Sequence, residues 1–165
     1  MKRREWWANT VWRTLLALAP RLARPDDVFA RQTLTGAEYG LYRKMDVRDC
    51  VHACAVARRL EALYPDAPDT LRRAALLHDV GKAGYAYRPW HRIFVALYTP
   101  RTVAPTPRLS GLRGAWQLRR HHDRYGAEAI LNVGGDARVA ELVARHHRPG
   151  RDAEAARLME IDARF

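Results

Sequence analysis

Apolar residues recur with helical spacing along most of the chain, and short turn signals separate the repeats. The strongest repeat begins after Asp46, a residue suited to cap a helix, and predicts a helix over residues 46–64. A turn cluster over residues 64–69 and a second apolar run predict another helix from Thr70 to Asp79. Asp69 could cap that helix. These two helices form a predicted helical hairpin.

The second half of the chain also predicts a series of helices. Pro89 opens a helical run that ends before a basic, proline-containing loop over residues 100–107. Helical spacing returns before and beyond His122, again over residues 139–146, and from Asp152 to the end of the chain. The sequence shows no convincing strand pattern, repeat or low-complexity segment. The predicted fold class is therefore all-α.

The first residues differ from the rest of the chain. Residues 1–24 carry six Lys or Arg against one Glu, and their tryptophans are Trp6, Trp7 and Trp12. Two interpretations stay open: a basic amphipathic helix at an anionic membrane surface, or a helical arm that packs on the domain through its Trp face. The apolar run here is split by Arg13 and too short to span a bilayer. We predict a basic Trp-rich arm over residues 1–25 and one domain over residues 26–165.

Composition narrows the classes of partner. The 165 residues contain 29 Lys or Arg and 18 Asp or Glu, a net charge of +11, and 48% are hydrophobic, which is typical of a folded protein. The charge favours anionic partners: phosphorylated small molecules, nucleic acid or an acidic membrane surface. Cys50 and Cys54 lie four residues apart, a spacing that suits packing rather than a disulfide. A reducing cytoplasm is the expected location.

The positions of the seven histidines suggest the chemistry. Most of them fall on predicted helices that also carry apolar residues, together with two carboxylates; the residues concerned are His52, His78, Asp79, His121, His122, His146, His147 and Asp162. A buried imidazole without a partner costs about 1–3 kcal/mol. A shared metal ion explains the set more economically than several separate core histidines. We expect His91 on a helix surface and His121 beside the site, as a solvated neighbour or a phosphate contact.

Specific stretches of sequence carry a family resemblance. The first stretch, on one predicted helix, is Met45-Asp46-Val47-Arg48-Asp49-Cys50-Val51-His52. The second, at the end of the next predicted helix, is Ala75-Leu76-Leu77-His78-Asp79-Val80-Gly81-Lys82. Two later stretches are His122-Asp123-Arg124-Tyr125-Gly126-Ala127-Glu128 and Ala144-Arg145-His146-His147. Over residues 39–162 the chain resembles the HD-domain metal-dependent phosphohydrolase superfamily. The resemblance implies an HD-domain helical bundle that binds divalent metal.

The resemblance also implies site residues. The expected metal ligands are His52, His78, Asp79, His122, His146, His147 and Asp162. Asp79 would be shared between two divalent ions, such as Mn, Fe or Mg, and Asp79 and Lys82 are the expected catalytic residues. Lys82 would stabilise the phosphoryl group, although a charge favoured at a helix C-terminus is an equal alternative. The expected substrate-binding residues are Lys82, Arg120, Arg124, Arg145 and Arg148.

Three functions are compatible with the sequence. The leading one is a metal-dependent phosphohydrolase that acts on a nucleotide or other phosphoester through one or two metal ions. The alternatives are a di-iron oxygenase of the same superfamily and a non-catalytic protein that binds nucleic acid or phosphate. Residues 148–151 lack the Gly-Tyr-Pro signature of cyclic di-GMP phosphodiesterases, and Arg48 stands where trinuclear members carry a Glu ligand. We expect a cytoplasmic protein, with peripheral membrane contact of residues 1–24 left open.

Overall fold

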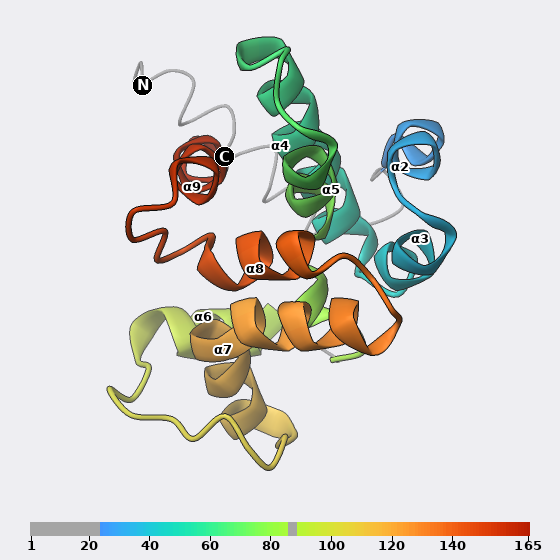
Figure 1. The fold of residues 1–165 in the computed structure, drawn as a ribbon. Coiled ribbons are helices and arrows are strands. Elements are labelled where there is room, and N and C mark those ends of the chain that lie inside the picture. The colour runs from blue at the N-terminus through green and yellow to red at the C-terminus, as the bar shows by residue number, and fades with distance from the viewer. Residues whose placement is uncertain (1–23, 86–88) are drawn as a thin grey trace.

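The computed structural model describes residues 24–85 and 89–165, and all regular structure in these two ranges is helical (Figure 1). The elements are α2 (Asp27–Thr33), α3 (Gly36–Tyr42), α4 (Val47–Leu63), α5 (Asp69–Leu77), the short 3-10 helix η2 (Val80–Lys82), α6 (Pro89–Leu97), α7 (Gly111–Asn132), α8 (Ala137–Arg145) and α9 (Ala153–Asp162). The all-α prediction is confirmed. The predicted N-terminal arm falls almost wholly outside the described residues.

Aspartate side chains begin several of these helices. Asp46 caps α4 by accepting a hydrogen bond from the backbone N–H of Arg48 at 2.9 Å, as the sequence predicts. Asp136 and Asp152 cap α8 and α9 in the same way. The prediction that Asp69 caps α5 is wrong: Pro68 occupies the N-cap position, and Asp69 is the first helical residue. At that position its carboxylate still interacts favourably with the helix dipole.

The end of α5 also differs from the prediction. The helix stops at Leu77 rather than Asp79, with His78 as its C-cap, and Asp79 is the N-cap of η2. The α-helix α5 therefore gives way to the 3-10 helix η2 between His78 and Asp79. This break lets two adjacent side chains approach one another, with 3.6 Å between His78 Nε2 and Asp79 Oδ2.

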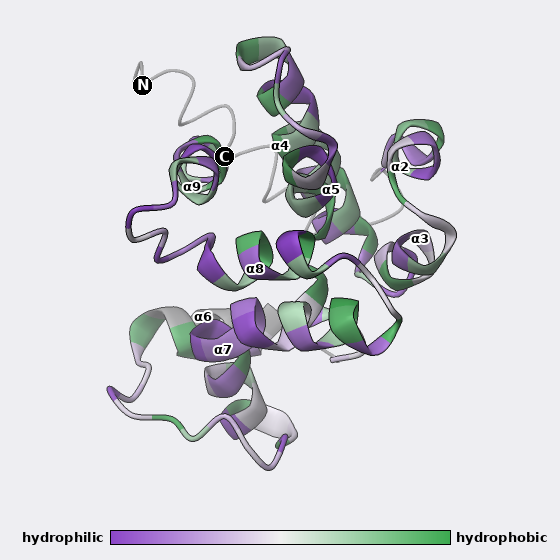
Figure 2. Cartoon of the chain, viewed as in Figure 1, coloured by the Kyte–Doolittle hydropathy of each residue, from purple (hydrophilic) through white to green (hydrophobic). Residues whose placement is uncertain are grey.

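The core forms where the central helices cross. The predicted hairpin is present, with α4 packed on α5, while α8 lies between α5 and α7 and α9 packs against α4 (Figure 1). Buried apolar residues from α2, α3, α4, α5, α7, α8 and α9 form one cluster at these contacts, and most helices carry both apolar and polar residues (Figure 2). Among the largest fully buried apolar side chains are Leu60, Leu71, Leu76, Leu77, Ile130, Leu142, Leu158 and Ile161. This arrangement brings the ends of α5, α8 and α9 toward the middle of α7 and the first half of α4.

A buried ion pair ties α3 to α5. Glu38 is fully buried and accepts hydrogen bonds from Arg73 at 2.9 and 2.5 Å. Glu38 also accepts from the backbone N–H of Thr35, which completes a capping box at the start of α3. Loss of one partner would leave a buried charge without compensation, so the pair fixes the relative position of these helices.

No helix in the described part of the chain is both long and apolar enough to cross a membrane.

Candidate metal centre

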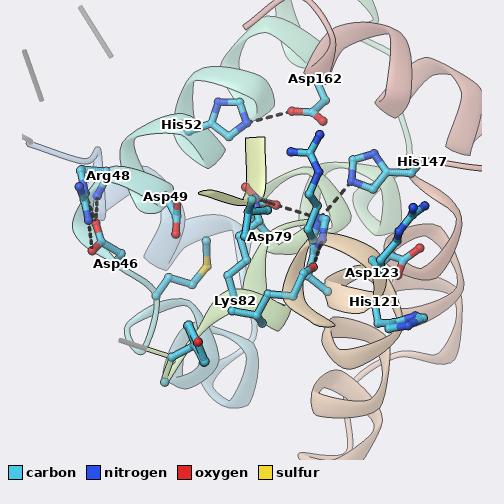
Figure 3. A pocket seen from close by; sticks show the side chains of 18 of the residues that line it. Asp46, Arg48, Asp49, His52, Asp79, Lys82, His121, Asp123, His147 and Asp162 are labelled. Atoms are coloured by element: carbon cyan, nitrogen blue, oxygen red, sulfur yellow. Dashed lines mark hydrogen bonds and ion pairs between the residues drawn. The ribbon is translucent and has the colours of Figure 1, made fainter. Parts of the chain in front are cut away.

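Three helices contribute to a first group of donor atoms. His52 on α4, His78 at the end of α5 and Asp162 at the end of α9 hold their donor atoms within 4.8 Å of one another. His52 Nε2 lies 2.9 Å from Asp162 Oδ1 (Figure 3), and His78 Nε2 lies 3.5 Å from the same oxygen. Two imidazole nitrogens and a carboxylate therefore converge from segments that are far apart in sequence.

A second group consists of histidines alone. His122 on α7, His146 at the end of α8 and the next residue, His147, also hold donor atoms within 4.8 Å of one another. His147 Nε2 lies 3.0 Å from His122 Nε2. Adjacent residues rarely share one face of a helix, but α8 ends at Arg145, so His146 and His147 lie where the chain leaves the helix and both reach the group.

Asp79 lies between the two groups. Its Oδ2 is 3.6 Å from His78 Nε2 in the first group, and its Oδ1 is 3.4 Å from His122 Nε2 in the second. The side chain is almost completely buried. Each oxygen of one carboxylate thus faces a different cluster, an arrangement suited to a bridging ligand.

Backbone carbonyl groups orient the buried imidazoles. The Nδ1–H groups of His78, His122 and His146 donate to the carbonyl oxygens of residues 75, 118 and 143, at 2.9, 2.8 and 2.6 Å. These bonds place a proton on Nδ1 and point each Nε2 inward, as is usual for metal-binding histidines.

Two of these inward nitrogens have no hydrogen-bond partner. The Nε2 atoms of His78 and His146 are buried and form no hydrogen bond with any described residue. Leaving two such atoms unsatisfied costs about 1–3 kcal/mol each. A divalent cation at each group would satisfy these atoms and would also balance the charges of Asp79 and Asp162. The donor set therefore fits the metal centre that the sequence predicts.

Both carboxylates of the centre are held in the charged form. Burial alone would raise the pKa of Asp79, but the nearby charges of Lys82 and His78 outweigh it and lower the pKa. Burial likewise opposes ionisation of Asp162, but the hydrogen bond from His52 and the nearby charge of His78 hold its pKa well below the usual range. Ionised carboxylates are the form that binds a cation.

The pKa values of the histidines shift in two directions. In the second group, burial and neighbouring cations lower the pKa of His122 to about 4 and that of His146 to about 2, so both are neutral donors at physiological pH. Burial also lowers the pKa of His147. For His78, burial opposes protonation, but Asp79 and Asp162 prevail and raise the pKa to about 9. The same negative field that attracts a proton to His78 would attract a metal cation.

A large cavity opens beside the centre. It has a volume of about 1900 Å³, and its wall includes His52, Asp79, His122, His147 and Asp162 (Figure 3). Lys82 also lines it, with Nζ 2.6 Å from Asp79 Oδ1, and that carboxylate raises the pKa of the ammonium despite its burial. A permanent positive charge thus stands beside the bridging carboxylate.

The structure divides the predicted substrate-binding arginines. Arg120 and Arg148 line the cavity; Arg120 donates to the carbonyl oxygen of Pro100, and Arg148 lies 3.4 Å from Asp123 Oδ2. Arg124 and Arg145 are not among the lining residues. They are exposed and pair with Glu128 and Glu141 on their own helices, at 2.8 and 3.1 Å. This geometry gives no support for substrate contacts by Arg124 and Arg145.

Two further histidines occupy unexpected surroundings. The prediction that His91 lies on a helix surface is wrong: it is 4% exposed and packs against Trp90, with ring centroids 3.8 Å apart. His121 lines the cavity, and its Nε2 lies 2.6 Å from the carbonyl oxygen of Val103. His121 is therefore engaged with the loop before α7 and belongs to neither cluster.

Sequence reasoning missed several residues of the cavity wall. Asp49, an acidic residue in the first turn of α4, lines the cavity. Its spacing of three residues from His52 places both on one helix face and could have indicated the role. Buried Asp123 follows His122 directly. Arg101 also lines the cavity, and no sequence signal distinguishes it from the other arginines. Arg119, which lies with Arg120 among the arginines that flank the expected ligands in sequence, lines the cavity as well.

Comparison with known proteins identifies the family of this chain. The HD domain family matches residues 50–164, more than half of the chain. This chain belongs to the HD domain family. Neither the curated proteins nor the solved structures yield a match to it. HD domains are mostly metal-dependent phosphohydrolases and usually bind divalent metals. The family match begins at residue 50, so the predicted domain start at residue 26 stays a prediction.

Proposed function

We propose that this HD domain is a phosphohydrolase that cleaves a nucleotide or other phosphoester with two divalent ions. One ion would be held by His52, His78 and Asp162, and the other by His122, His146 and His147. The observation that carries the proposal is the position of Asp79, whose two oxygens face the two groups at 3.6 and 3.4 Å. A bound pair of such ions polarises a phosphoryl group and supplies a nucleophilic hydroxide at neutral pH.

The chain's own residues prepare the site for this reaction. Asp79 and Asp162 remain ionised, and the backbone carbonyls that bind Nδ1 fix three imidazole rings before any ligand arrives. Such pre-organisation avoids reorganisation during the reaction. The ammonium group of Lys82 stands at the cavity wall, where it would donate to a phosphoryl oxygen and offset its negative charge.

The cavity supports a substrate larger than a simple phosphate ester. Pockets for drug-sized ligands usually measure about 300–1,000 Å³, and this cavity is about 1900 Å³. Guanidinium groups also line it beyond the two clusters; they belong to Arg48, Arg101, Arg119, Arg120 and Arg148. A substrate with several negative charges, such as a nucleotide, would contact some of these while its scissile phosphate reaches Asp79 and Lys82.

The decisive test combines metal analysis with a panel of phosphoesters. Asp79→Asn removes the bridging charge with little change in size, so we expect metal content to fall and phosphate release to become undetectable. Asp66→Asn makes the same chemical change in the exposed turn after α4 and should behave like the wild type. Circular dichroism and urea unfolding would verify that both variants fold.

The outcomes separate the alternatives. A folded Asp79→Asn variant with unchanged metal content and phosphate release would overturn the proposal. Tightly bound iron with oxygen uptake and no phosphate release from any ester would identify an oxygenase instead. Retained metal, no turnover and salt-sensitive affinity for RNA or DNA would point to a binding protein.

A further inference from the structure

The chain has a long segment without any carboxylate. Between Asp79 and Asp123 the sequence contains no Asp or Glu, whereas Lys and Arg occur at positions 82, 88, 92, 101, 108, 113, 119 and 120. The segment includes η2, α6, the proline-containing loop and the first half of α7. Much of the positive charge of the domain is therefore concentrated in one continuous stretch, with no acidic residue of its own to neutralise it.

Within this segment, α6 turns large apolar side chains outward. Trp90 is 45% exposed, Phe94 54%, Leu97 79% and Tyr98 64%. Their spacing of four, seven and eight residues from Trp90 places them on one side of the helix, which we call the α6 face. Val95 on the opposite side is buried and lines the cavity. One side of α6 thus belongs to the cavity wall and the other is an exposed apolar surface.

Contacts with α7 fix the α6 face to the domain and place cations beside it. Trp116 on α7 donates its indole N–H to the carbonyl oxygen of Tyr98 at 2.9 Å, and the two rings meet edge to face with centroids 6.0 Å apart. Arg113 and Arg120 precede and follow Trp116 by three and four residues, so they share its side of α7. Both are exposed. Aromatic and aliphatic groups therefore adjoin guanidinium groups on one surface.

We propose that the α6 face docks on a lipid bilayer that contains anionic phospholipids. Phe94 and Leu97 would enter the outer acyl region, and Trp90 and Tyr98 have the amphipathic rings that favour the headgroup level. Exposed arginines, including Arg101, would pair with lipid phosphates. This surface is separate from the metal ligands, and the proposal does not depend on the reaction assigned to them.

Charge and shape disfavour three other partners for the α6 face: a second copy of the chain, residues 1–24 and nucleic acid. A symmetric contact between two copies would place the arginines beside one α6 face against those beside the other. Residues 1–24 are themselves strongly basic, so their charge opposes docking on this segment. Nucleic acid matches the charge, but Leu97 is the most exposed member of the face and offers no aromatic plane for base stacking.

Vesicle co-sedimentation of the full chain tests the proposal. We expect binding to vesicles of phosphatidylcholine with phosphatidylglycerol, weaker binding to phosphatidylcholine alone, and loss of binding at high salt. The double variant Phe94→Asp and Leu97→Asp should bind at least about tenfold more weakly, because both side chains would have to leave the acyl region. Val28→Asp with Leu131→Asp is the matched control, since these residues are 68% and 53% exposed on α2 and at the end of α7. Equal binding by the two double variants would overturn the proposal, because attachment would then use another part of the chain.

A local probe reports on α6 itself. Leu97→Cys can carry a polarity-sensitive fluorophore, because native Cys50 and Cys54 are buried, and Val28→Cys provides the control position. We expect a blue shift on addition of anionic vesicles for the label at position 97 only. A response to single-stranded RNA with none to vesicles, or equal shifts at both positions, would refute membrane docking. Metal content and phosphate release in vesicle-free solution should match the wild type, so failure here is distinct from failure of the proposed function.

Discussion

The backbones of Gly81 and Gly126 face one another with no room for a side chain between them. A Cβ atom on Gly81 would lie 2.7 Å from the backbone nitrogen of Gly126 and 1.9 Å from the carbonyl oxygen of His122. A Cβ atom on Gly126 would lie 3.2 Å from the nitrogen of Gly81. The close approach of η2 to α7 sets the 3.4 Å distance from Asp79 to His122, and thereby the spacing between the two clusters.

Gly81→Ala should therefore disrupt both stability and the metal centre. The added methyl group meets backbone atoms that cannot rotate away, so η2 must shift, and overpacking of this kind costs about 1–3 kcal/mol. Gly40→Ala in α3 is the matched control: nothing lies within 4 Å of its Cβ position, and alanine favours a helix by about 0.5–1 kcal/mol. Urea unfolding and metal analysis would measure both. A Gly81→Ala variant with wild-type stability and metal content would contradict this role of the contact.

The sequence predicts which residues come near the centre better than it predicts their roles. Helical spacing and the family resemblance identified the histidines of both groups, because each lies on or just after a helix with an apolar face. His147 reaches its group only because α8 ends at Arg145, and hydrophobic periodicity does not fix that helix boundary. For Arg145 the sequence does contain the relevant signal, because Glu141 four residues earlier predicts the ion pair that the structure shows.

Metal binding should stabilise the protein through the two unpartnered nitrogens. An ion present at 100 times its dissociation constant adds about 2.7 kcal/mol to the free energy of unfolding. In His146→Gln we expect this stabilisation to fall and about one ion per chain to be lost, because Nε2 of His146 belongs to a single cluster. His121→Gln is the control, since His121 bonds to the loop carbonyl of Val103. Thermal unfolding with and without Mn²⁺, followed by a chelator, would measure the difference. Equal stabilisation of both variants would exclude His146 as a ligand.

Both cysteines should be inert in the native protein. Burial raises the pKa of Cys50 to about 12 and also raises the pKa of Cys54. The thiolate is the reactive form, and an unperturbed cysteine has a pKa of about 8.5, so native thiols should not react with a disulfide reagent at about pH 8. The same reagent should titrate both thiols once guanidinium chloride unfolds the chain. Fast labelling of the native protein would show that the packing of α4 against its neighbours opens readily.

Acid should loosen the attachment of α9, the helix that carries Asp162. Asp152 caps α9 through the backbone N–H groups of Glu154 and Ala155, and its carboxylate accepts hydrogen bonds from Arg138 at 2.7 and 3.0 Å. The arginine hydrogen bonds, the largest cause, lower the pKa of Asp152. The stability that comes from this lowered pKa is thus present above the unfolded-state pKa of about 3.9 and is lost as pH falls through the lower folded value.

Two substitutions at Asp152 separate the cap from the charge. Asp152→Asn keeps a good capping side chain and loses the ion pair, whereas Asp152→Ala loses both and should destabilise the fold by about 2 kcal/mol at neutral pH. In urea unfolding, the gap between the wild type and Asp152→Asn should close as the medium becomes acidic enough to protonate Asp152. The gap to Asp152→Ala should shrink but persist, because a neutral carboxyl group still accepts from the helix N–H groups. A gap to Asp152→Asn that stays constant from neutral to strongly acidic pH would show that charge contributes nothing, and that α9 is held by its cap and its buried face alone.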